Sequence, residues 1–200
     1  MDTSTKTLPE GYAKSGEINL KKNKSLAITL NIAAVPVGVL SFFLLASIAT
    51  SIRPSLMDFS GTLTAGTAAI AVGLVVILMT IHELIHGVFF WIFTRSKPVF
   101  ALRLFYAYAG APDWYIPARQ FAFVVLSPLV IIGAAGFLLM LLVPESWVLF
   151  IAFLVALNTG GSMGDLLVFA RLLKLPPASL TNDTGDVVTF YERQSSTANS

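Results

Sequence analysis

The two histidines of this chain stand four residues apart, in the segment His-Glu-Leu-Ile-His at positions 82–86. On an α-helix, residues i and i+4 lie on the same face, so the imidazoles of His82 and His86 can bind one metal ion. Glu83 is turned about 100° around the helix axis from the first histidine. This H-E-x-x-H pattern is typical of zinc metalloproteases, in which the glutamate acts on a water molecule at the metal. Gly87 follows and would let another backbone approach closely.

A third metal ligand must come from elsewhere in the chain. Catalytic zinc usually has three protein ligands and one water molecule, and the chain contains no cysteine. Asp165 lies in a later apolar stretch, with Asn158 and Ser162 at spacings that place all three on one polar stripe of a continuous helix. Neighbouring glycines weaken the helix and allow close packing or local unwinding. In the competing interpretation, Asp165 sits at a helix end near Arg171 and reaches the membrane interface.

The elements that must position these residues are membrane-spanning helices. Hydrophobic residues make up 56% of the chain and charged residues 12%, whereas soluble domains have about 25% charged residues. Four stretches reach the roughly 20 apolar residues that a spanning helix needs: Leu26–Ile52, Leu63–Phe93, Phe121–Val143 and Trp147–Phe169. Ser127-Pro128 is expected to kink the third stretch. We therefore predict an all-α integral membrane protein, folded as a four-transmembrane-helix bundle.

The predicted position of residues 82–86 inside a membrane argues against a chance match to the H-E-x-x-H pattern. Each charged group at the centre of a bilayer costs about 2.5–3.5 kcal/mol on the insertion scale. Three ionisable residues inside one predicted span therefore indicate function. His86 lies seven residues before the end of its span and Asp165 four before the end of its own. These offsets differ by only about 5 Å along a helix axis, so one metal ion could join the two side chains.

Basic residues are distributed unevenly among the loops. Of the thirteen lysines and arginines, the two loops on one side of the predicted membrane hold only Arg53. The basic side is expected to be cytoplasmic, which places both termini there. We predict a cytoplasmic N-terminal tail at 1–24, a four-helix transmembrane domain at 25–174 and a cytoplasmic C-terminal tail at 175–200. Low hydrophobicity predicts that the tails are unstructured, apart from a strand-like run at Val187–Tyr191.

The loop Val99–Ile116, between the second and third predicted spans, has two interpretations. Its apolar beginning is followed by a turn signal at positions 110–113. One interpretation is a short β-hairpin at the membrane interface, whose edge strand could hold a substrate peptide in an extended conformation. The other is an aromatic belt, because Phe, Tyr and Trp favour the depth of the lipid headgroups.

These motifs give the chain a resemblance to known proteins. It resembles the site-2 protease class of intramembrane zinc metalloproteases, and more closely the small bacterial membrane proteins classed as putative zincin peptidases. The resemblance covers roughly residues 63–169 and rests on H-E-L-I-H in one span and N-x6-D in a later one. It implies that His82, His86 and Asp165 bind Zn²⁺, that Glu83 is the catalytic base, and that the protein lies in a bacterial plasma membrane.

The second motif departs from the site-2 protease pattern. Those proteases usually carry a proline-containing segment that ends in Leu-Asp-Gly. Here Asp165 follows Gly-Ser-Met-Gly, and Leu166 takes the place of the final glycine. The chain is also too short for a PDZ-like insertion.

Three functions are compatible with the sequence. The first is a zinc-dependent intramembrane metalloprotease, with Glu83 as general base on a zinc-bound water and a membrane protein or peptide as substrate in the lipid bilayer. The second is a metal-binding membrane transporter or sensor, in which Glu83 is a further ligand or a proton carrier. The third is an inactive relative that binds client helices, although such a binder needs no base. The small net charge of +2 and the absence of a basic stripe argue against nucleic-acid binding.

Overall fold

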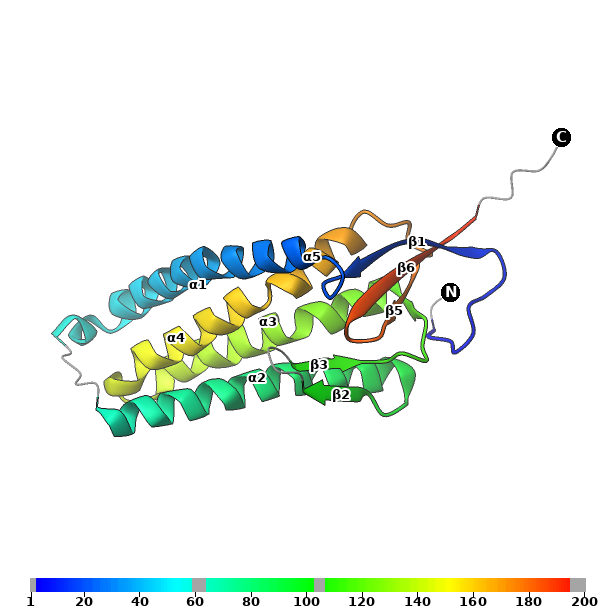
Figure 1. Ribbon diagram of the computed structural model, residues 1–200. Helices are drawn as coiled ribbons and strands as arrows, with labels where there is room; N and C mark the ends of the chain where they lie inside the picture. The colour runs from blue at the N-terminus through cyan, green and yellow to red at the C-terminus, as the bar shows by residue number, and fades with distance from the viewer. Residues whose placement is uncertain (1–2, 59–63, 103–106, 195–200) are drawn as a thin grey trace. The chain divides into compact units, whose positions relative to one another are not determined.

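The structure is a computed structural model that describes residues 3–58, 64–102 and 107–194 (Figure 1). The chain divides into two compact units, which we describe separately. The mixed unit, which contains the strands, consists of Met1–Ala27, Glu83–Ser127 and Asp165–Ser200. The helical unit consists of Ile28–His82 and Pro128–Gly164.

The described residues form mostly α-helices. Their bounds are α1 Lys24–Ile52, α2 Ala65–Thr94, α3 Ala118–Leu142, α4 Glu145–Gly161 and α5 Met163–Leu172, and a 3-10 helix covers Pro54–Asp58. The first three are each long and apolar enough to cross a membrane. The short helices α4 and α5 reach that length only when the bent pair is taken as one span. Three apolar, span-length helices are therefore present, whereas the predicted four-helix bundle depends on how this pair is counted.

The predicted fourth span is interrupted at Ser162. Its backbone N–H and its hydroxyl both donate to the carbonyl of Asn158, at 2.9 and 2.8 Å, and close the last turn of α4. The preceding pair Gly160-Gly161 gives this turn little intrinsic helical preference. The helix that was predicted to carry the polar stripe is therefore bent rather than continuous, and Asn158 and Asp165 belong to its two parts.

Small residues let helices of the helical unit pack closely. A Cβ atom on Gly160 of α4 would lie 2.7 Å from the carbonyl oxygen of Ala34 in α1. A Cβ atom on Gly136 of α3 would lie 2.1 Å from a methyl group of Val155. Such contacts bring backbones together where apolar lipid offers little driving force for association. The buried core of this unit consists of Ala49, Leu56, Met140, Val148 and Ala152.

The two terminal segments and a short strand before α3 form a four-stranded antiparallel sheet in the mixed unit, in the order β1-β6-β5-β4 (Figure 1). The strands are β1 Tyr12–Asn19, β6 Val187–Arg193, β5 Leu180–Asp183 and β4 Ile116–Pro117. The prediction of unstructured tails is therefore wrong over β1 and β5, whereas the strand-like run predicted at Val187–Tyr191 is confirmed within β6. Each strand is too polar to fold alone, but pairing satisfies the backbone groups, and the sheet buries Phe190 against the helices.

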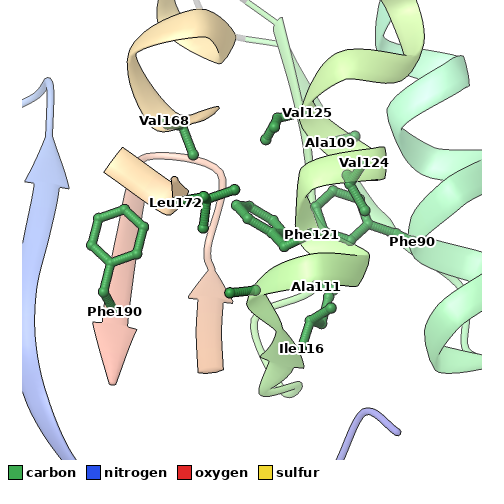
Figure 2. Packing of buried hydrophobic residues seen from close by; sticks show 11 residues of the cluster. Phe90, Ala109, Ala111, Ile116, Phe121, Val124, Val125, Val168, Leu172 and Phe190 are labelled. Atoms are coloured by element: carbon green, nitrogen blue, oxygen red, sulfur yellow. The ribbon is translucent and has the colours of Figure 1, made fainter. Parts of the chain in front are cut away.

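Large side chains from helices and strands fill the core of the mixed unit. Figure 2 shows Phe90 of α2, Phe121 of α3, Leu172 of α5 and Phe190 of β6 in one cluster. The rings of Phe90 and Phe121 lie 6.1 Å apart between centroids, a distance at which aromatic pairs attract. This core fixes the part of α2 that carries the second histidine relative to α3 and α5.

A second, two-stranded sheet follows α2. Strand β2 (Val99–Leu102) pairs antiparallel with β3 (Ala107–Gly110), with Val99 opposite Gly110. A hairpin is thus present within Val99–Ile116, but its strands lie on either side of positions 103–106, which are outside the described residues. The predicted turn at positions 110–113 instead leads from β3 to β4 in the other sheet. The place of the hairpin at a membrane interface stays a prediction.

Candidate metal centre

The two histidines share one helix and are both buried. His82 is 6% and His86 8% exposed, near the middle and towards the end of α2. An imidazole from each and a carboxylate oxygen of Asp165 lie within 4.8 Å of one another. The three predicted ligands are therefore brought together, although the aspartate comes from a separate short helix.

Each imidazole is held by an oxygen atom at its Nδ1 nitrogen. For His82 the partner is the side-chain oxygen of Asn158, at 2.9 Å, and for His86 it is the backbone carbonyl of Val124, also at 2.9 Å. Because these oxygens accept hydrogen bonds, each Nδ1 donates to its partner, and each Nε2 is the nitrogen left to bind a metal ion. Partners of this kind fix the tautomer and the ring orientation of histidines that bind metals.

The distance between His86 and Asp165 fits two ligands of one metal ion. The Nε2 atom of the histidine and the Oδ1 atom of the aspartate are 3.4 Å apart. Two ligands at about 2.1 Å from a tetrahedral zinc ion would lie about 3.4 Å apart. A direct charge-assisted hydrogen bond would be shorter, about 2.7–2.9 Å. Two imidazole nitrogens and one carboxylate oxygen also form a donor set that zinc commonly accepts.

Glu83 is oriented by a strand of the hairpin. Its Oε2 atom accepts a hydrogen bond of 2.9 Å from the backbone N–H of Ala109 in β3. Within the described residues, the group that could hold a metal contains both histidines and Asp165 but not this glutamate. The arrangement is compatible with a carboxylate that acts beside a metal rather than on it.

The hairpin packs directly on α2 next to the second histidine. A Cβ atom on Gly87 would lie only 2.2 Å from the ring of Phe100 in β2. Gly87 was expected to admit another backbone, but the neighbour is an aromatic side chain. A larger residue at this position would force the ring of Phe100 to move away from the helix.

A turn near the C-terminus supports β3 from the other side. The ring of Tyr108 lies within 1.9 Å of where a Cβ atom of Gly185 would be, and this glycine has a φ of +86°. The N–H of Ala111 donates to the backbone oxygen of Asp183 at 2.9 Å. The turn between β5 and β6 thus fixes the strand that binds Glu83.

Asp183 itself was not singled out from the sequence. Burial raises the pKa of its carboxyl group to about 7, although the N–H of Gly185 donates to it at 2.7 Å and favours the ionised form. The nearby charge of His86 also lowers this pKa, and those of Asp165 and Glu83 raise it. The residues next to Asp183 in the sequence are polar and do not indicate that its carboxyl group is buried. The burial comes from residues that are distant in the sequence.

More than half of the chain matches a known protein family. A family model described as putative zincin peptidase matches residues 75–180. The matched segment contains the H-E-x-x-H motif and Asp165. Neither the curated proteins nor the solved structures compared with the chain include a match.

Proposed function

The chain belongs to the family of putative zincin peptidases, and from this premise we propose that it is a zinc metalloprotease that cleaves peptide bonds in or beside the membrane. The observation that carries the proposal is the group of His82, His86 and Asp165, whose ligand atoms converge within 4.8 Å. Two of these residues lie on a helix that is long and apolar enough to cross a bilayer. Ionisable residues in such a helix are functional by default.

The three residues of this group would hold the metal ion. When bound, zinc would supply a Lewis acid that lowers the pKa of water to about 7 and polarises a substrate carbonyl. The Nδ1 partners, Asn158 and the carbonyl of Val124, would keep both Nε2 atoms directed at that position. The transporter alternative needs a ligand set that releases its ion readily, and these two fixed imidazoles favour a resident metal instead.

Glu83 would act as the general base. Its carboxylate would take a proton from the attacking water and later deliver it to the leaving amine, so that the peptide bond is exchanged for a carboxylate and an amine. The hydrogen bond from Ala109 fixes one oxygen of the carboxylate at 2.9 Å and limits its rotation. A base that is held in place loses little entropy when the reaction begins.

The hairpin β2–β3 is the proposed binding surface for substrate. A peptide bond inside a helix is shielded by its own hydrogen bonds, so cleavage requires an extended segment. Strand addition at a sheet edge would supply that conformation through backbone hydrogen bonds. Val99 and Phe100 are 47% and 48% exposed on β2, and could contact apolar side chains of the substrate.

We also propose that both termini face the cytoplasm, on the basis of the uneven distribution of basic residues. Reporter fusions at Ser146 should then read external, and fusions at Lys97 should read cytoplasmic. The reverse pattern would contradict this topology.

The decisive experiment compares the parent with Glu83→Gln after reconstitution with zinc and a set of transmembrane peptides. The variant should keep its zinc and lose hydrolysis by about 10²–10⁴-fold, because glutamine retains the size but not the basicity. Glu10→Gln, on an exposed residue, is the control and should match the parent. Cleavage by Glu83→Gln at the parent rate would refute the assigned role. A zinc-loaded parent that moves ions without cleaving any peptide would favour the transporter.

A further inference from the structure

Helix α3 contains a proline in its interior, four residues after Val124. Proline has no backbone N–H, so Pro128 cannot donate the helical hydrogen bond to the carbonyl of Val124. Its ring also collides with that carbonyl and turns it away from the helix axis. The carbonyl is instead paired with the Nδ1 of His86 at 2.9 Å and with the hydroxyl of Ser127 at 2.8 Å.

We propose that Pro128 is a positioning residue for the metal centre. Its missing N–H leaves the carbonyl of Val124 open to the imidazole of His86, which in turn directs Nε2 towards the metal. This inference rests on the proposed zinc function and goes beyond it, since it assigns a role to a residue that touches neither metal nor substrate.

The carbonyl oxygen of Val124 has a limited number of sites for hydrogen-bond donors. A carbonyl oxygen has two lone pairs, and Ser127 and His86 occupy both. Alanine at position 128 would bring a third donor, its own N–H, to the same oxygen. The Val124 side chain is 1% and Ser127 6% exposed, so a donor displaced from this oxygen would have little access to water. The helical N–H has the fixed geometry of the backbone, whereas the imidazole can rotate away.

A second proline provides a matched comparison. Pro36 lies inside α1 and removes a helical hydrogen bond in the same way. Helix α1 contains none of the three proposed ligands. A general effect of proline on helix shape or folding would therefore appear at both positions, whereas an effect through the carbonyl of Val124 would appear at Pro128 alone.

The test measures zinc affinity by chelator competition on the full-length protein in detergent, for the parent, Pro128→Ala and Pro36→Ala. Pro128→Ala should bind zinc about 10–100-fold more weakly, the usual loss when an outer partner of a ligand is removed. Its metal-free form should still fold, which circular dichroism would check, since alanine favours a helix interior. Pro36→Ala should keep the parent affinity. Parent affinity in Pro128→Ala would overturn the inference.

The double variant Ser127→Ala/Pro128→Ala supplies a rescue. Removing the Ser127 hydroxyl vacates one lone pair of the Val124 carbonyl, which the new N–H can then occupy without displacing the imidazole. Part of the lost affinity should return. An equal or greater loss in the double variant would overturn the proposed competition. If the parent protein binds no zinc, the proposed function itself is refuted. If the parent binds zinc and both proline variants bind it equally well, only the role of Pro128 is refuted.

Discussion

The two histidines of the metal centre are held in different ways. In the helical unit, His82 is fixed by a side chain, the amide of Asn158, which is 2% exposed and also donates to the carbonyl of Pro128 at 3.4 Å. In the mixed unit, His86 is fixed by a backbone carbonyl. A side-chain partner depends on the residue type at one position, whereas a backbone partner depends on the path of a helix. Substitutions should therefore affect the two halves of the centre through different routes.

The largest effect on metal binding is expected at the carboxylate ligand. Asp165→Ala removes the oxygen that lies 3.4 Å from Nε2 of His86, and leaves only two protein ligands. Zinc affinity should fall by more than the roughly 100-fold that loss of an outer partner causes. Metal analysis of the purified variant measures this directly. Full zinc occupancy would show that Asp165 is not the third ligand.

The side-chain partner of His82 can be tested by a pair of substitutions. Asn158→Leu removes the acceptor for Nδ1 and should weaken zinc binding by about 10–100-fold. Asn158→Asp keeps an oxygen at that position and should retain more affinity than Asn158→Leu. Chelator competition on both variants gives the comparison. Equal losses in the two variants would mean that the amide contributes packing and not orientation.

The turn that supports β3 offers a test of how Glu83 is positioned. Gly185→Ala would force the ring of Tyr108 to move, because the new Cβ would overlap it. Turnover should fall by up to about 100-fold while zinc content stays unchanged, since small displacements of a catalytic group cost that much. Gly11→Ala is the matched control, because Gly11 also has a positive φ, of +78°, but no atom within 4 Å of the new Cβ. Similar turnover in both variants would remove Tyr108 from the mechanism.

A further effect is expected on the pH dependence of stability, through Asp183. Its pKa is raised to about 7 in the folded protein from an ordinary 3.8, so the folded state holds a proton that the unfolded state releases. The metal-free parent should lose stability as pH rises from about 4 to about 7. Above pH 7, Asp183 is ionised in both states and should no longer change the stability. Asp183→Asn should flatten this part of the profile. Unfolding temperatures between pH 5 and pH 8 measure it, and identical slopes would contradict the prediction.

Local patterns in the sequence predicted the apolar helices and the grouping of the candidate metal ligands better than the sheets. Apolar runs and the spacing of His82 and His86 depend on one helix each, and both appear in the structure. The pairing of Tyr12 with Arg193 joins segments that are far apart in the sequence. The second segment contains the strand-like run Val187–Tyr191, but the polar sequence of β1 gave no signal of a strand. The partner of the second histidine is a carbonyl, which every residue has. The sequence pointed to this carbonyl only indirectly, through Pro128, from which we predicted a kink in the helix.

The order of strands in the four-stranded sheet has a consequence for biosynthesis. Strand β6 is paired between β1 and β5, yet it follows both of them along the chain. Ribosomes add about 5–20 residues per second, so Tyr12 would wait about 10–40 s for Arg193. During that interval the helices can enter the bilayer while β1 has no neighbour. A chain that ends before Val187 would carry the H-E-x-x-H segment but lack β6, which pairs with both β1 and β5 in the sheet.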